Sequence, residues 1–448
     1  MTMPPVRVIS FSGDGTGEGE LTWSQRLYWL GMQRDGRSAA MGGWTEMPAG
    51  TTVDAVAADL ARILCRYPSL RTRLILAPSV RQRCFSSGTL DLQVIDGAFG
   101  DPLALAEECS FSFLDRSFDY EHEWPVRAAV VVDGAEVRYF VMVYLHTALD
   151  AGGLATMLRD LRSEVVSPAP TPLELAARQA LPAAQRGSAA ALRHQESVLR
   201  QLEPERAPVG VRVPQLLWFG SRALALAIPL ICDANQADGA AAMFAAFVAG
   251  LTRFTGDRQA VVAMMVSNRF RPGLADVVGT LAQDSMLAID TEGITFAELV
   301  IRCRRGLLTA FKSAYYDPVA RDALVAQLAD GARLQPWCLY NDRRVGAVTP
   351  EMTDPVELMK ALDSTYWLRQ PEASSPDRRV FLHVDERPGE IELALSTDSR
   401  WYDEAASIEL LRLIEGAAIC GAVAPGTLAE DCSLATARAA IQPDPIRL

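Results

Sequence analysis

The sequence predicts a mixed α/β protein built from two lobes of comparable size. Strand-like and helix-like hydrophobic patterns occur in similar proportion in both halves of the chain. A segment with three prolines at 167–172 separates the halves, and such a segment favours an extended spacer. The 448 residues are 49% hydrophobic and 22% charged, which is enough for two to three domain-sized cores. We expect an N-terminal lobe at 1–170, a linker and connecting helix at 171–210, and a C-terminal lobe at 211–448.

The N-terminal half reads as a succession of turns, helices and strands. The glycine-rich stretch 13–19 lacks both the G-x-G-x-x-G spacing and the lysine of a P-loop, and so predicts a flexible turn. Thr22 is a plausible N-cap for a helix, and Asp133-Gly134 is a hairpin signal. The expected elements are a helix from Thr22, a helix at 53–66, a strand at 70–76, paired strands at 128–132 and 137–145, and a helix at 154–161.

The C-terminal half shows the same mixture. An alanine- and leucine-rich stretch with many charges, 178–206, predicts the connecting helix. The elements expected after it are a strand at 223–231, a buried helix at 240–254, a strand at 261–266, a helix at 299–312, strands at 381–384 and 391–395, and a helix at 405–419.

Charge and composition exclude several classes. The net charge of −12 opposes non-specific binding to nucleic acid or to an anionic membrane. Only Lys312 and Lys360 are lysines, so 41 of the 43 basic residues are arginine, which points to a high-GC genome such as that of an actinobacterium. The sequence has no signal peptide and no apolar run of about 20 residues, so we expect a cytoplasmic protein. The eight cysteines form no C-x-x-C pair and predict buried thiols.

Four histidines are few enough to consider singly. His146 ends a predicted strand, and Asp150 follows four residues later in an H-x-x-x-D pattern. His122 lies on an acidic loop, His194 on the charged helix and His383 inside a strand. No metal-ligand spacing and no G-x-S-x-G motif occurs. By itself the H-x-x-x-D pattern is short, and a structural histidine remains the alternative to a catalytic one.

Six segments, in order along nearly the whole chain, carry a resemblance. They are Leu21-Thr22-Trp23-Ser24-Gln25, Arg66-Tyr67-Pro68-Ser69-Leu70-Arg71-Thr72-Arg73-Leu74, Ser117-Phe118-Asp119 with Trp124-Pro125-Val126-Arg127, His146 to Gly153, Ser267-Asn268-Arg269-Phe270-Arg271-Pro272 with Val278-Gly279-Thr280-Leu281-Ala282-Gln283, and Arg400-Trp401-Tyr402-Asp403. Together they resemble the condensation domains of nonribosomal peptide synthetases, in the chloramphenicol-acetyltransferase-like superfamily. The resemblance implies two such lobes in a V-shaped pseudo-dimer with a central tunnel.

The resemblance also implies roles for particular residues. His146 matches the catalytic histidine, and Asp150 matches an aspartate that braces the fold by an ion pair with an arginine, here Arg269. The positions implied for substrate binding are Gly152, Gly153, Gln283 and Ser285. No metal and no cofactor is implied in the protein itself.

The chain departs from the family pattern at several positions. Leu145 replaces the first histidine of H-H-x-x-x-D-G, and Ala151 replaces its glycine. Gly153 replaces the final serine, Gln283 an asparagine, and Tyr67 another histidine. Ala151 narrows the backbone opening beside the turn and puts the channel for the acyl donor in doubt. The pattern suits either an unusual enzyme or a degenerate domain kept as a docking platform.

The resemblance implies acyl transfer in natural-product biosynthesis. We expect a free-standing, monomeric condensation enzyme that moves an acyl or peptidyl group from a phosphopantetheine thioester on a carrier protein to a small amine or alcohol. Arg302, Arg304 and Arg305 could dock the acidic carrier, or could simply be the solvated face of a helix. The alternatives are a non-catalytic recruitment domain and an acyltransferase that uses acyl-CoA.

Overall fold

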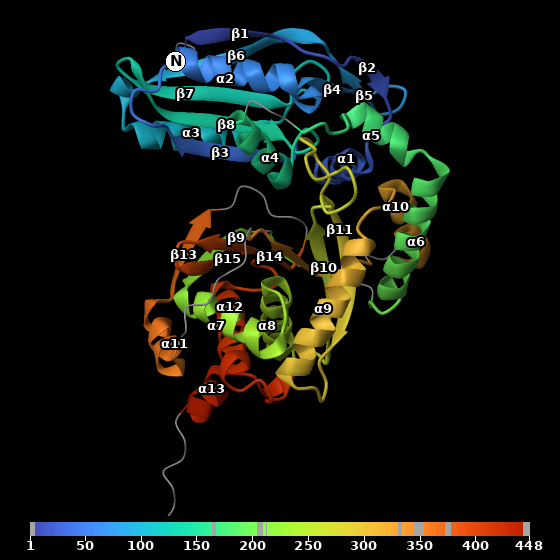
Figure 1. Ribbon diagram of the computed structural model, residues 1–448, viewed down its shortest axis with the longest axis vertical. Helices are drawn as coiled ribbons and strands as arrows, with labels where there is room; N and C mark the ends of the chain where they lie inside the picture. The colour runs from blue at the N-terminus through green and yellow to red at the C-terminus, as the bar shows by residue number, and fades with distance from the viewer. Residues whose placement is uncertain are drawn as a thin grey trace, which may run out of the picture. The chain divides into compact units, whose positions relative to one another are not determined.

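The computed structural model describes residues 5–163, 167–203, 209–211, 213–329, 334–344, 354–371 and 378–441 (Figure 1). Contacts divide the chain into two compact units. Unit 1 contains Met1–Ala189, Ser267–Gln283 and Tyr315–Arg321, and unit 2 contains the remainder. The boundaries expected at 170 and 210 stay a prediction. The two units are not simply the two halves of the chain, because residues 267–283 and 315–321 of the second half belong to unit 1.

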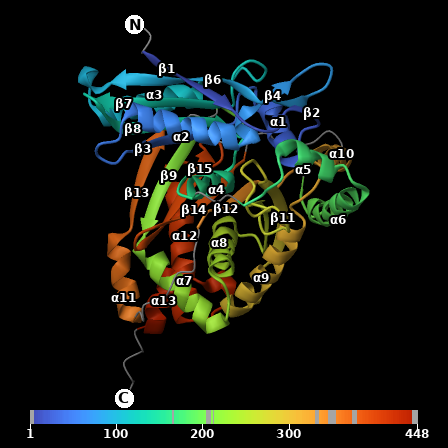
Figure 2. The ribbon, with the colours of Figure 1, turned by 45° about the horizontal axis from the view of Figure 1, so that its top comes forward.

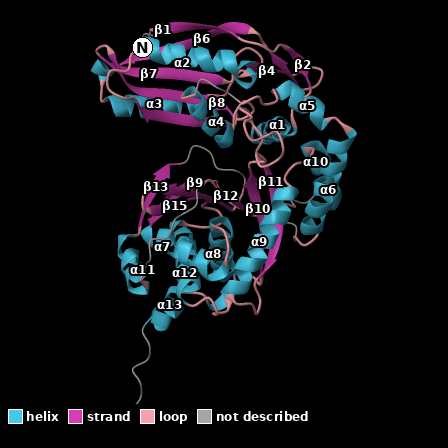
Figure 3. Ribbon diagram, viewed as in Figure 1, coloured by secondary structure: helices cyan, strands magenta, loops and turns pink. Residues whose placement is uncertain are grey.

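Unit 1 is built on a five-stranded sheet, as far as the described residues go (Figure 3). Its order is β1-β6-β7-β8-β3, and every neighbouring pair is antiparallel except β6 and β7. The hairpin predicted at Asp133-Gly134 is confirmed, with Gly134 at φ 63°. The strands are β1 (Val6–Ser12), β3 (Ala40–Glu46), β6 (Ser87–Asp96), β7 (Val126–Asp133) and β8 (Glu136–Leu145).

Both faces of this sheet are covered by apolar side chains. Side chains alternate between the two faces of a strand, so Val130 of β7 joins one apolar cluster and Val131 joins the other. Helix α2 (Val53–Arg66) contributes to the first cluster, and α3 (Pro102–Asp115) contributes to the second. β8 therefore runs through a rigid, two-sided core before it ends at Leu145.

The shorter elements of unit 1 surround this core. The predicted helix from Thr22 is confirmed: Thr22 caps α1 and forms a capping box with Gln25. The strand expected at 70–76 is shorter, because residues 68–71 form a 3-10 turn first. The elements are α1 (Trp23–Asp35), β2 (Gly17–Gly19), η1 (Pro68–Arg71), β4 (Thr72–Ile75), β5 (Arg81–Cys84), η2 (Gly97–Phe99), α4 (Ala151–Leu161) and α5 (Pro172–Gln179).

The glycine-rich turn is held by a buried arginine. Arg71 is fully buried and donates to the carbonyls of Asp14, at 2.6 Å, and of Phe85. A Cβ on Gly13 would lie 1.9 Å from the Cys65 carbonyl oxygen, so only glycine fits there. The stretch that reads as a flexible turn in the sequence is thus fixed against the core.

Unit 2 is built on a mixed seven-stranded sheet, again within the described residues. β10, β12 and β14 are parallel, and β14, β15, β9 and β13 are antiparallel. The order is β11 (Gln283–Asp290), β10 (Gln259–Val266), β12 (Cys338–Asp342), β14 (Val380–Arg387), β15 (Glu390–Asp398), β9 (Pro214–Ser221) and β13 (Tyr366–Pro371).

Three buried helices, α7, α8 and α12, form the core of unit 2 with this sheet (Figure 2). The helices predicted at 240–254, 299–312 and 405–419 are confirmed. Helices α6 and α10 cross the boundary between the units. The helical elements are α6 (Pro182–Leu199), α7 (Arg222–Asn235), α8 (Gly239–Thr255), α9 (Phe296–Lys312), α10 (Pro318–Ala329), α11 (Pro355–Ala361), η3 (Leu362–Ser364), α12 (Glu404–Val423), η4 (Ala429–Asp431) and α13 (Leu434–Ile441).

One predicted element is wrong. The strand expected at 223–231 is helix α7, and the strand is β9 just before it. Ser221 ends β9 and accepts a hydrogen bond from the Leu224 amide at 3.0 Å, so it caps the helix. The run is apolar at nearly every position, and such a run does not distinguish a buried strand from a buried helix.

The part of the chain that the structure describes contains no helix with the length and apolar character needed to cross a bilayer.

Candidate active site

His146 occupies the turn that follows β8. Its backbone amide donates to the carbonyl of Ala39 at 2.7 Å. The Ala148 amide then donates to the Leu145 carbonyl at 2.9 Å and closes a turn. The histidine predicted at a strand end therefore stands on a turn that is tied to the edge strand of the sheet.

His146 is half-buried, and one face of its ring is covered by another side chain. It stacks on the Tyr28 ring, with centroids 3.7 Å apart and ring planes 17° from parallel. Its Nδ1 is enclosed and has no hydrogen-bond partner among the described residues. Burial lowers the pKa of His146 below its ordinary 6.5, although the Asp150 charge and the backbone at His146 and Leu149 oppose this. The imidazole is therefore neutral near pH 7 and able to accept a proton.

Asp150 is buried and its carboxylate is fully engaged. Oδ1 accepts the Gly153 amide at 2.7 Å and so caps α4. Oδ2 accepts the amides of Leu281 at 2.8 Å and Ala282 at 2.9 Å. A carboxylate with these partners holds two segments together and has no lone pair left for a substrate proton.

Arg269 completes the contacts of Asp150. Its guanidinium lies 2.7 Å from Oδ1 and 3.0 Å from Oδ2 of the aspartate, in a bidentate ion pair. The same group donates to the carbonyls of Val277 and Gly279, at 3.2 and 3.0 Å. Arg269 lies in the segment 267–283, so this ion pair lies within unit 1.

Gly152 and Gly153 stand in the first turn of α4, where neighbouring groups approach the backbone closely. A Cβ on Gly152 would come within 2.6 Å of Arg269 Nη1. A Cβ on Gly153 would lie 2.5 Å from the Gly279 carbonyl oxygen. Close packing therefore explains why glycine occupies both positions. Their expected contact with substrate stays a prediction.

The other two positions expected to bind substrate lie in β11. Gln283 is buried, and its Nε2 donates to the Tyr316 carbonyl at 3.0 Å within unit 1. Its Oε1 is buried without a partner among the described residues, and so is the Ser285 hydroxyl. Ser285 belongs to unit 2, whereas the His146 cluster belongs to unit 1.

The positions that depart from the family pattern have apolar or structural surroundings. Leu145 is 3% exposed and packs among apolar residues such as Val143 and Phe118. Ala151 is exposed at the start of α4. Tyr67 donates its hydroxyl to Asp160 at 2.8 Å. An apolar site thus takes the place of the first imidazole.

The remaining histidines belong to other elements of the chain. His122 is exposed and lies against Asp119. His194 lies on α6, with its Nε2 2.9 Å from the Met286 carbonyl oxygen. His383 lies in β14 beside Asn341. Tyr28 and Ala39 contact His146 but were not predicted; the one signal for Tyr28 is its place one helical turn after Gln25.

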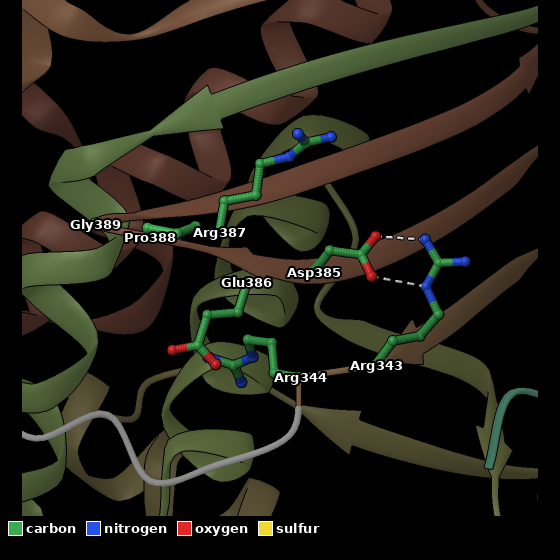
Figure 4. A pocket seen from close by; sticks show the side chains of 7 residues that line it. All are labelled: Arg343, Arg344, Asp385, Glu386, Arg387, Pro388 and Gly389. Carbon is green, nitrogen blue, oxygen red and sulfur yellow. Dashed lines mark hydrogen bonds and ion pairs between the residues drawn. The ribbon is translucent and has the colours of Figure 1, made fainter. Parts of the chain in front are cut away.

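Small hollows adjoin the turn, and a larger one lies elsewhere. Thr147 lines two cavities of about 10 Å³ each within unit 1. A cavity of about 450 Å³ in unit 2 is lined by Arg343, Asp385, Glu386 and neighbouring residues (Figure 4). Figure 4 shows Arg343 and Asp385 facing each other in a two-bonded ion pair. This cavity contains none of the predicted site residues.

Among the described residues, no three histidine, cysteine or acidic side chains gather as metal ligands would. The eight cysteines are free thiols, and five of them are buried.

Together, these features define a mixed α/β protein with a neutral histidine on a turn and a structural aspartate–arginine pair behind it. By sequence, the chain matches no protein family and no curated protein. Its fold is that of solved condensation domains. The SgcC5 protein from Streptomyces globisporus is 18% identical, with a TM-score of 0.69 over 92% of this chain and 100% of its own.

Two further solved structures share this fold. The first condensation domain of the calcium-dependent antibiotic synthetase, in complex with a substrate analogue, is 16% identical, with a TM-score of 0.70 over 94% of this chain and 99% of its own. The X-domain from teicoplanin biosynthesis, in complex with OxyB, is 17% identical, with a TM-score of 0.67 over 94% and 97%. The chain therefore has the fold of condensation domains.

Proposed function

We propose that this chain is a condensation enzyme that transfers an acyl or peptidyl group from a carrier-protein thioester to an amine or hydroxyl nucleophile. The observation that carries the proposal is that His146 and Asp150, on the same turn, have different environments. His146 has a neutral imidazole with no hydrogen-bond partner at Nδ1 among the described residues, while Asp150 is committed to Arg269 and three backbone amides. A general base must be neutral before it accepts a proton, and a structural brace must have its oxygens engaged by the groups that it holds.

The proposed reaction is a nucleophilic acyl substitution. The amine nitrogen attacks the thioester carbonyl, a carbon–nitrogen bond forms, and the nitrogen loses a proton to the His146 imidazole. The carbon–sulfur bond then breaks, and the pantetheine thiolate leaves and takes up that proton. General-base help of this kind contributes about 10²–10⁴-fold, and holding both reactants together contributes more. The phosphopantetheine belongs to the carrier protein, and the protein itself needs no cofactor.

The test is substitution of the proposed base. We expect His146→Ala to lower turnover of an acyl-loaded carrier protein with an amine panel by about 10²-fold or more, measured by mass spectrometry. His122→Ala is the matched control, because His122 is exposed. Full turnover by a folded His146→Ala protein would rule out this function. Turnover with acyl-CoA but not with the loaded carrier would favour a CoA-dependent acyltransferase instead.

A second candidate function is a recruitment platform without catalysis. Two features of this chain favour it: Leu145 is buried in an apolar cluster where the motif has a histidine, and Ala151 replaces the motif glycine. The X-domain with this fold was solved in complex with another protein, OxyB. Under this reading, the chain binds its partner equally well with His146→Ala, and neither protein forms product from a loaded carrier.

A further inference from the structure

One of the two small cavities beside the turn is enclosed by five segments that are far apart in the sequence. It has a volume of about 10 Å³ and lies within unit 1. Its lining comes from the start of α1, from η1, from residues 147–148 of the turn, from the start of α5 and from the segment 277–280. This volume is about the room that one water molecule needs.

Two hydroxyl groups in the lining lack a hydrogen-bond partner. Ser69 is 1% exposed and Thr280 is 5% exposed, and neither hydroxyl forms a hydrogen bond within the part of the chain that the structure describes. A buried hydroxyl that has lost its hydrogen bonds to solvent and gained none in return destabilises the folded state. Native proteins satisfy nearly all such groups, either with a protein group or with an ordered water. Two unsatisfied hydroxyls that line one cavity therefore indicate a shared partner.

The other groups at this cavity narrow the choice of that partner. Thr22 and Gln25 bond to each other in the capping box of α1, and the Gly279 carbonyl accepts from Arg269 Nη2 at 3.0 Å. The buried Thr147 lines the cavity with a third hydroxyl. No charged side chain among the described residues belongs to the lining, so the partner is neutral. It must be as small as water, and water both donates and accepts hydrogen bonds as hydroxyl groups require.

A water at this place would join two segments of unit 1. On the side of the turn, the Asp150 amide donates to the Gly279 carbonyl at 3.4 Å, and the Asp150 carboxylate accepts the Leu281 amide at 2.8 Å. Thr280 stands between these two contacts, and Ser69 stands in η1. A bridge from Thr280 to Ser69 would therefore fasten the segment that binds Asp150 to η1 as well.

We propose that this cavity is a binding site for one structural water molecule, which bridges the hydroxyl groups of Ser69 and Thr280. The water accepts a hydrogen bond from one hydroxyl and donates to the other, and Thr147 supplies a third partner. The inference does not depend on the proposed function, because the site needs no substrate.

Variants that lack one or both hydroxyls test the bridge by their stability. Ser69→Ala and Thr280→Val each remove one partner of the water, and we expect each to lower the thermal midpoint of the whole chain by about 2–4 °C. The double variant removes both groups that need the water, so it should lose no more than the larger single loss. Additive losses in this pair would overturn the proposal.

The matched control pair is Ser110→Ala with Thr280→Val. Ser110 is also buried, but it lies on α3 and does not line the cavity. Without a shared partner, the losses of the control pair should add.

A high-resolution crystal structure of the wild-type chain tests the site directly, and it stays decisive if a variant does not fold. We expect one peak of electron density at about 2.5–3.0 Å from both the Ser69 and the Thr280 hydroxyl oxygens. An empty cavity would overturn the proposal, and so would a peak that lies within this distance of only one of the two hydroxyls.

Discussion

At the scale of single residues, the turn after β8 depends on two glycines that cannot carry a side chain. A Cβ on Gly152 would displace the Arg269 guanidinium, 2.6 Å away, from the buried Asp150. We expect Gly152→Ala to destabilise the protein by about 1–3 kcal/mol, measured by urea unfolding. Gly31→Ala, inside α1 with no atom within 4 Å of the new Cβ, is the control and should be neutral or stabilising by about 0.5–1 kcal/mol. Equal effects of the two changes would contradict this account.

The sequence predicts those parts of the site that lie close together along the chain. His146, Asp150 and the two glycines stand within eight residues, where a strand end and a helix start already imply their arrangement. The similarity to a known family supplied Arg269. Tyr28 and Ala39 could not be predicted, because their contacts depend on how α1 packs against the end of β8, and spacing along a chain carries no record of packing.

At the scale of secondary structure, most helices followed from their caps and periodicity, and α7 did not. Its first turn depends on Ser221, which accepts the Leu224 amide and donates to the buried Glu415 at 2.7 Å. The hydrogen bond to Glu415 forms only when α12 packs against α7 in the folded protein. The apolar run in the sequence therefore did not indicate where the strand ends and the helix begins. The same dependence makes this cap unusually important.

We expect Ser221→Ala to lower the free energy of unfolding by about 2–3 kcal/mol, because it removes the cap and one donor to a buried carboxylate. Thr52→Ala is the comparison: the Thr52 hydroxyl caps α2 by accepting the Ala55 amide at 3.2 Å at an exposed site, and its loss should cost about 1 kcal/mol. Chemical denaturation measures the free energy of unfolding of both variants. If Ser221→Ala loses less than Thr52→Ala, Glu415 does not need this hydrogen-bond donor.

At the scale of the whole molecule, two half-buried histidines make stability depend on pH. Burial lowers the pKa of His383 to about 3 and lowers that of His146 as well. The unfolded chain then binds protons below about pH 6.5 that the native protein does not, so stability falls as pH drops. We expect unfolding at pH 5 to require about 2 kcal/mol less than at pH 7 for His383 alone. In His383→Gln this dependence should flatten, and an unchanged slope would exclude His383 as a cause.

The net charge of −12 does not show where the 41 arginines lie or which of them face solvent. Many arginines are internal: Arg71 is fully buried among carbonyls, and Arg127 is buried against Glu123. On α9, Arg302 contacts Asp290, and Arg304 lies 3.9 Å from Asp238. A count of arginines therefore could not say which of them are available to a partner.

Arg305 is the arginine of α9 best placed to contact an acidic partner. It is exposed, has no acidic partner among the described residues, and lies between the exposed Ile301 and Leu308 on one face of α9. A carrier protein with an acidic, partly apolar helix would fit this face. We expect Arg305→Glu to weaken carrier binding by about tenfold in a titration at low salt, and by less at high salt. Arg186→Glu makes the same charge change on α6 and should bind as the wild type does. If both variants bind the carrier equally well, the carrier docks elsewhere.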